Sequence, residues 1–139
     1  MNPELELETV KYSIEDIYPQ LVLQDPLFCD HSDLPYMHPV EREFATLLLT
    51  RGFIVFREPT ILDCEHIPDF FIFNRRSQSG KLVEITLLKE DLTNGHIGRK
   101  TKKRKERQLE ALQECGVPFV VLYREQMENI RANCWEDLF

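Results

Sequence analysis

Long hydrophobic runs are missing from this sequence, and so is a basic amino-terminal segment. No apolar stretch is long enough to span a bilayer, and the first residues carry Glu4, Glu6 and Glu8 instead of positive charges. We therefore expect no membrane attachment and no export, and we predict an intracellular, cytoplasmic protein. Cysteines are few and irregularly spaced, at positions 29, 64, 115 and 134. This spacing predicts reduced thiols rather than a disulfide framework.

Net positive charge, which many nucleic-acid-binding proteins carry, is also lacking, because the formal net charge is −7. One short window is nevertheless strongly basic, with seven positive side chains and the single acid Glu106. The seven are Arg99, Lys100, Lys102, Lys103, Arg104, Lys105 and Arg107. Since phosphate binding depends on the local potential, this window can hold a nucleic acid on an acidic protein. The alternative interpretation is a solvated, self-repelling helix face.

The length of 139 residues, with 42% of them hydrophobic, fits one compact domain with its own core. Residues 1–37, which carry several acids and prolines, predict an amino-terminal extension that wraps this core, with a short helix or turn and an extended piece. Residues 38–139 predict the domain itself, with helices and strands in the order αβββαβα. They are expected at 38–51 (helix), 53–56, 69–73 and 82–88 (strands), 99–115 (helix), 117–123 (strand) and 125–133 (helix). This order predicts an α/β fold, a central mixed sheet flanked by helices.

The orientation of the long basic helix follows from its apolar residues. Leu109 and Leu112 mark the buried stripe, and the helical repeat extends this stripe backwards to Lys105 and Lys102. We expect these two lysines to point toward the sheet, whereas Lys103 and Arg107 should point elsewhere. Inward lysines near a carboxylate site can bind phosphate or assist catalysis.

Two acids sit in strand-like apolar runs that a polar turn joins. Asp69 precedes residues 70–73, and Glu84 lies within residues 81–86. A carboxylate in a strand must be paired, bound to a cation or neutralised, because burial of a bare charge is costly. In the simplest hairpin register the two acids can meet and hold Mg²⁺ or Mn²⁺, which prefer hard oxygen ligands. The alternative is a pair of solvated acids at a sheet edge.

These features resemble the PD-(D/E)XK nuclease superfamily, which includes restriction endonucleases and archaeal Holliday junction resolvases. The similarity lies in the αβββαβ order, an acid in the first helix, Pro68-Asp69 on one strand and Glu84 on the next. It covers residues 38–123 and implies a restriction-endonuclease-like core, phosphodiester hydrolysis and pairing of two copies into a homodimer. The run Glu84-Ile85-Thr86-Leu87-Leu88-Lys89 is further similar to a bacterial subgroup with a Glu-Leu-Thr-x-x-Lys run before a basic helix.

The resemblance assigns a role to several residues of this sequence. Asp69 and Glu84 would be the metal ligands, together with the main-chain carbonyl of Ile85. Glu41 would be the helix acid that holds a metal-bound water. Glu41 is preferred to Glu43 because its position stacks closer to the buried side of the helix. The alternative is that both are ordinary surface acids, since glutamate is common in helices.

One position departs from the superfamily pattern, which has a lysine two residues after the second acid. This chain has Thr86 there, and threonine cannot supply the cation that orients the attacking water. A lysine from elsewhere must then serve, or the site is inert. Helix geometry favours Lys102 or Lys105, and the resemblance to the subgroup favours Lys89.

We therefore expect an endonuclease that acts on DNA with Mg²⁺ or Mn²⁺, with the basic helix on flanking phosphates. The first alternative, which Thr86 favours, is a nuclease-like fold without catalysis that binds nucleic acid or dimerises. The second alternative is a zinc site with ligands from two Cys-x-His pairs, Cys29 with His31 and Cys64 with His66.

Overall fold

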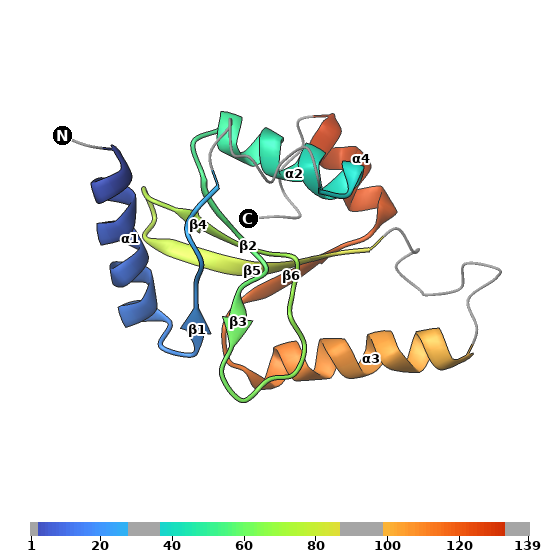
Figure 1. Ribbon diagram of the computed structural model, residues 1–139. Coiled ribbons are helices and arrows are strands. Elements are labelled where there is room, and N and C mark those ends of the chain that lie inside the picture. Colours follow the sequence, from blue (N-terminus) through green and yellow to red (C-terminus); the bar gives the residue numbers. More distant parts are fainter. Residues whose placement is uncertain (1–2, 28–36, 87–98, 133–139) are drawn as a thin grey trace.

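The computed structural model describes residues 3–27, 37–86 and 99–132, in which four helices and six strands are present (Figure 1). The helices are α1 (Pro3–Ile17), α2 (Pro39–Thr50), α3 (Arg99–Glu114) and α4 (Arg124–Arg131). The strands are β1 (Leu21–Val22), β2 (Ile54–Arg57), β3 (Thr60–Ile61), β4 (Phe70–Asn74), β5 (Ser79–Ile85) and β6 (Phe119–Leu122). In these three ranges no helix has the length and apolar character needed to cross a membrane.

Four strands form an open mixed sheet in the spatial order β2-β4-β5-β6. β4 is antiparallel to both β2 and β5, whereas β6 runs parallel to β5. A parallel pair needs a long crossover connection, and α3 lies in the segment that joins these two strands. β1 and β3 form a separate antiparallel ribbon. The predicted mixed α/β class is confirmed.

Helices cover both faces of the sheet, with α2 and α4 on one face and α3 on the other (Figure 1). Phe70 and Ile72 of β4 belong to the hydrophobic cluster that includes residues of α2 and α4. Phe71 and Phe73 belong to the opposite cluster, which includes residues of α1 and α3. Because successive strand residues point to opposite faces, the continuous apolar run of β4 is buried on both sides.

The ends of two helices follow from their flanking residues. Pro39 opens α2, where its missing N–H costs no helical hydrogen bond, and the His38 side chain accepts a hydrogen bond from the Val40 N–H. Gly52 follows α2 with a φ of 88°, and Gly116 follows α3 with a φ of 78°. Both glycines supply the left-handed conformation that ends many helices.

Several boundaries differ from the prediction. β5 begins at Ser79 rather than at residue 82, because the connecting turn is shorter than expected and Gln78 adopts a positive φ of 54°. The ribbon strand β3 was not predicted, and α1 is longer than the short helix or turn expected there. Residues 87 and 88, predicted as the end of a strand, lie outside the described residues.

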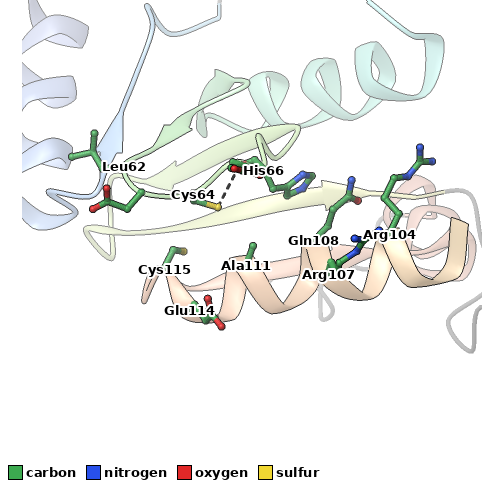
Figure 2. Close-up of a pocket in the computed structure, with 11 residues that line it drawn as sticks. Leu62, Cys64, His66, Arg104, Arg107, Gln108, Ala111, Glu114 and Cys115 are labelled. Carbon is green, nitrogen blue, oxygen red and sulfur yellow. Dashed lines mark hydrogen bonds between the residues drawn. The ribbon is translucent and has the colours of Figure 1, made fainter. Parts of the chain in front are cut away.

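A cavity of about 720 Å³ lies between the loop of residues 62–66 and one side of α3 (Figure 2). His66 and Gln108 are among the residues that line it. The His66 ring also contacts Glu84, and Gln108 also lines a small pocket that contains Glu84 and Lys105. The cavity therefore borders the end of β5, where the predicted acids are found.

Candidate functional site

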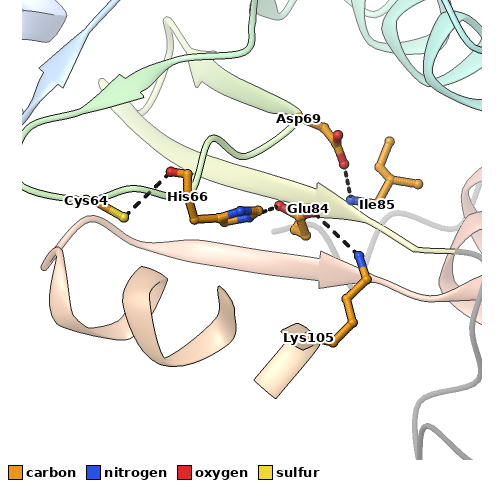
Figure 3. A network of polar contacts seen from close by, with 6 residues as sticks. All are labelled: Cys64, His66, Asp69, Glu84, Ile85 and Lys105. Atoms are coloured by element: carbon orange, nitrogen blue, oxygen red, sulfur yellow. Dashed lines mark hydrogen bonds and ion pairs between the residues drawn. The ribbon is translucent and has the colours of Figure 1, made fainter. Parts of the chain in front are cut away.

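Asp69 and Glu84 lie at the same end of the sheet. Phe70 pairs with Val83 across the β4–β5 hairpin, so the next residues outward are Asp69 and Glu84. The Asp69 carboxylate reaches over to β5, where its Oδ2 accepts a hydrogen bond of 2.7 Å from the Ile85 N–H (Figure 3). The antiparallel register thus brings the two predicted acids to adjacent strands at one edge.

Glu84 has its own set of partners on the α3 side. Its Oε2 lies 2.7 Å from His66 Nε2, and its Oε1 lies 3.9 Å from Lys105 Nζ (Figure 3). The side chain is buried, with only 9% of its surface exposed. Burial raises the pKa of Glu84 above its usual range, and the charge of Asp69 raises it further, whereas His66 and Lys105 oppose the shift. The two acids interact through their charges, and each has a different set of hydrogen-bonding and ionic partners.

Glu41 of α2 is the third acid of the site. Its pKa is raised to about 7, first by burial, then by a hydrogen bond with Asp69 and by the negative charge of Asp69. Glu43 forms an ion pair with Arg131 of α4 instead. The structure therefore agrees with the preference for Glu41 over Glu43 as the helix acid closer to Asp69, while the role of Glu41 stays a prediction.

Lys105 is the predicted lysine that the structure brings to the acids. Its inward orientation, expected from the helical repeat, is confirmed by the ion pair with Glu84. The structure describes the backbone of Lys102 in α3 but not its side chain. Lys89 lies outside the described residues. Thr86 is buried beside Glu84, and its N–H donates to the Leu122 carbonyl. No charge is therefore supplied at this strand position.

The rest of the predicted basic surface is only partly described. Lys103, Arg104 and Arg107 of α3 are exposed to solvent, as expected for Lys103. Arg99 and Lys100 open the same helix, and their side chains lie outside the description. The exposed basic residues lie on the same helix as Lys105, which contacts Glu84. Positive charge on α3 therefore lies near the acid site.

His66 is the residue of this site that the sequence analysis missed. It was considered only as a zinc ligand together with Cys64. In the structure its ring contacts Glu84, while the Cys64 thiol donates to the His66 carbonyl oxygen at 3.6 Å. The proposed partners Cys29 and His31 lie outside the described residues. The sequence offered one signal that His66 lies at this site. His66 is close to Asp69 in the sequence, and both residues belong to the loop that leads into β4.

The acids form no large ligand cluster. Among the residues that the structure describes, no three histidine, cysteine, aspartate or glutamate side chains are grouped closely enough to hold a metal ion. Mg²⁺ is commonly held by one or two carboxylates while it keeps several waters, so it needs no such cluster. The oxygen donors of Asp69 and Glu84 fit an ion of this type in number and in chemistry.

Comparisons with protein-family models, with curated proteins and with solved structures find no match for this chain. The resemblance to PD-(D/E)XK nucleases therefore stays a prediction from the sequence motifs.

Proposed function

We propose that this chain is a metal-dependent nuclease that hydrolyses phosphodiester bonds of DNA. The observation that carries the proposal is a series of interactions at one end of the sheet, in which Glu41 contacts Asp69, Asp69 interacts with Glu84 through charge, and Glu84 pairs with Lys105. The four residues come from separate elements: Glu41 from α2, Asp69 from the start of β4, Glu84 from β5 and Lys105 from α3. Such a combination of acids and a cation suits phosphoryl chemistry better than a purely structural role.

The order of the elements supports a restriction-endonuclease-like core. From α2 to β6 the chain runs α2, β2, β4, β5, α3 and β6, with the short β3 inserted after β2. The three antiparallel strands are followed by a helical crossover to a parallel strand. We propose that this is the αβββαβ core that the resemblance implies.

Asp69 and Glu84 would hold Mg²⁺ or Mn²⁺, together with the main-chain carbonyl of Ile85. The buried Glu84 carboxylate and its charge repulsion with Asp69 favour a bound cation, because a cation would stabilise both negative charges. The Ile85 N–H already points at Asp69, and the N–H and C=O of one strand residue point to the same side. When bound, the metal would supply Lewis acidity and a nucleophilic hydroxide.

The residues of the chain itself would divide the remaining work. Lys105 would take the place of the lysine that the superfamily pattern has at the position of Thr86. Its ammonium would orient a water and stabilise charge on the phosphate. Glu41 would hold the proton of its hydrogen bond with Asp69 near neutral pH and could position a water next to it. The exposed arginines and lysines of α3 would bind the flanking phosphates.

A second candidate function is a nuclease-like fold that binds nucleic acid without cleavage. The specific observation in its favour is that His66 and Lys105 already partner Glu84, while Thr86 occupies the usual lysine position. A Glu84 carboxylate satisfied by protein cations has less need of a metal ion. The two candidates differ in one measurable property, which is strand cleavage.

Incubation of the purified protein with supercoiled, branched and single-stranded DNA in Mg²⁺ or Mn²⁺ separates the two candidates. The nuclease proposal predicts cleavage that a chelator abolishes.

Asp69→Asn should lower the rate about a hundredfold or more, because a carboxylate ligand is lost while the side-chain volume is kept. Glu43→Gln is the matched control, since Glu43 is paired with Arg131 away from the site. Retention of full activity in Asp69→Asn would refute the proposal, and binding without cleavage would favour the second candidate.

A further inference from the structure

The cavity between residues 62–66 and α3 has the dimensions of a ligand site. Its volume of about 720 Å³ lies within the range of roughly 300–1,000 Å³ that pockets for small ligands usually have. Its walls come from two segments that are distant in sequence. His66 and Cys64 belong to the loop, and they face Gln108 and Cys115 of α3 (Figure 2).

The cavity borders the acid site through two residues. The His66 side chain lines it and also contacts Glu84 through Nε2. Gln108 lines it as well, one helical turn from Lys105, which is paired with Glu84. A molecule in the cavity would therefore lie next to a phosphate positioned at Asp69 and Glu84.

The lining of the cavity changes character along α3. Arg104 and Arg107 provide positive charge at the end closer to Lys105, where they can bind a phosphate. Farther along the helix, Ala111 and Cys115 lie opposite Cys64 and offer a less polar surface (Figure 2). A planar ring can pack against this surface, whereas Leu62, which is 55% exposed, points away from α3 (Figure 2).

Polar groups in the cavity are available to the edge of such a ring. Gln108 lines the cavity with its side chain, whose Oε1 is buried and accepts no hydrogen bond from the residues that the structure describes. Asp63, Glu65 and Glu114 add carboxylates, which favour amino groups and disfavour a second phosphate. The lining therefore fits a ligand with an anion at one end and an aromatic ring with N–H donors at the other.

We propose that this cavity binds one unpaired nucleotide of the nucleic-acid strand, with its phosphate on Arg104 and Arg107 and its base between Cys64 and Ala111. The inference deepens the proposed function and rests on it, because it assigns the substrate class as strands with a nucleotide outside a duplex. A base pair inside a continuous helix cannot enter a cavity of this volume unless the nucleotide leaves the stack.

The two cysteines that line the cavity provide a direct measurement of occupancy. Alkylation of Cys64 and Cys115 by iodoacetamide is followed by mass spectrometry, with Cys29 and Cys134 as internal references in the same digest. The full chain is labelled in chelator without divalent metal, so that no cleavage occurs. The probes are deoxyadenosine 5′-monophosphate, a single-stranded deoxyadenosine oligonucleotide, and a relaxed closed-circular duplex.

We expect the single strand to slow alkylation of Cys64 and Cys115 selectively, and the duplex to leave both rates unchanged. Equal protection by the duplex would overturn the proposal, and so would the absence of protection by the single strand. Protection by the mononucleotide but not by the strand would assign the cavity to a free nucleotide and overturn the substrate class. Protection by both the mononucleotide and the strand supports the proposal.

Variants of α3 test the two ends of the cavity. The double variant Arg104→Gln with Arg107→Gln should need a concentration of the single strand about tenfold higher or more for half-maximal protection of the cysteines. The reason is that charge-assisted hydrogen bonds to phosphate are lost. Arg76→Gln, at an exposed basic residue of the β4–β5 turn outside the lining, should change this concentration by less than about twofold. An unchanged concentration in the double variant would contradict the assignment of the phosphate end.

The apolar end is tested by Ala111→Leu, which fills the cavity, with Gln113→Leu on the exposed side of the helix as the control. Only Ala111→Leu should abolish protection, and circular dichroism verifies that both variants fold. These measurements need no catalysis, so failure of the cavity proposal is distinguishable from failure of the nuclease proposal. Protection without cleavage in Mg²⁺ would refute the nuclease but retain the nucleotide site.

Discussion

Asp69 connects the other acids of the site. It accepts a hydrogen bond from the Ile85 N–H, it shares a hydrogen bond with Glu41, and its charge raises the pKa of Glu84. A hydrogen bond between two carboxyl groups requires a proton, and the pKa of Glu41 is raised to about 7. The site is therefore sensitive to pH even without a metal ion.

Glu41→Gln should change how stability depends on pH. The pKa of Glu41 rises from 4.5 to about 7 on folding, so the folded state keeps a proton that the unfolded state releases within this window. This contribution to stability is present below the lower value and is lost as the pH rises toward the higher one. The variant should lack that loss and exceed the wild type at about pH 8 by on the order of 1 kcal/mol, since partial exposure screens the full effect.

Urea denaturation at about pH 5 and about pH 8 measures this difference. Glu43→Gln, on the same helix, is the control and should keep the pH dependence of the wild type. A Glu41→Gln variant whose stability falls with pH as steeply as that of the wild type would show that Glu41 is ionised throughout the window.

Lys105→Met should affect the chemistry through Glu84. The positive charge of Lys105 lowers the pKa of Glu84, so its removal should raise that pKa further and shift the acidic limb of the pH–rate profile upward. Loss of a cation near the phosphate should also reduce the rate of cleavage about a hundredfold. Cleavage assays across pH test both effects, with Arg76→Met, at an exposed basic residue of the β4–β5 turn, as the control. An unshifted limb with an unchanged rate would remove Lys105 from the site.

The sequence predicted much of this site at the level of single residues. Helical periodicity oriented Lys105 toward the sheet and favoured Glu41 over Glu43, because both positions follow a regular repeat. His66 could not be placed in the same way. It lies in an irregular loop, where no repeat relates sequence spacing to direction, and its contact with Glu84 depends on the whole path of residues 62–69.

The hairpin of β4 and β5 is the element that sets the distance between Asp69 and Glu84. Its packing depends on Gly80, where a Cβ atom would lie 2.7 Å from the Ile72 carbonyl oxygen and would also contact the Phe71 ring. The Tyr18 hydroxyl contacts the backbone N–H and C=O of Gly80, which attaches the end of α1 to this strand. The close approach leaves no room for a side chain.

Gly80→Ala should destabilise the protein by about 2–4 kcal/mol, because the added methyl group must displace Phe71 or the β4 backbone. Ser79→Ala, at an exposed neighbouring position of the same strand, is the control and should cost less than about 0.5 kcal/mol. Urea denaturation of both variants measures the difference. Equal stability of Gly80→Ala and the wild type would contradict the packing described for this hairpin.

Sequence patterns predicted whole elements better than their ends. The apolar run of β4 and the glycines after α2 and α3 are strong local signals, and the predicted elements agree with the structure. The start of β5 was missed because Gln78 adopts a conformation more typical of glycine. β3 was missed because a two-residue strand has no measurable alternation, and only its pairing with β1 defines it.

At the scale of the molecule, the amino-terminal segment takes part in the main core. Ile14 of α1, together with Leu21 and Leu23, belongs to the same cluster as Phe71 of β4 and Leu112 of α3. The face of the sheet that packs against α3 is therefore covered in part by residues before position 28. The homodimer implied by the resemblance stays a prediction.

The whole account depends on a cation shared by Asp69 and Glu84. Titration of the protein with Mn²⁺, followed by the electron paramagnetic resonance signal of the free ion, measures this binding directly. We predict that the wild type and Glu43→Gln bind Mn²⁺ with similar affinity, and that Asp69→Asn and Glu84→Gln each lose this binding. Mn²⁺ binding by both of these variants with the affinity of the wild type would contradict the central claim.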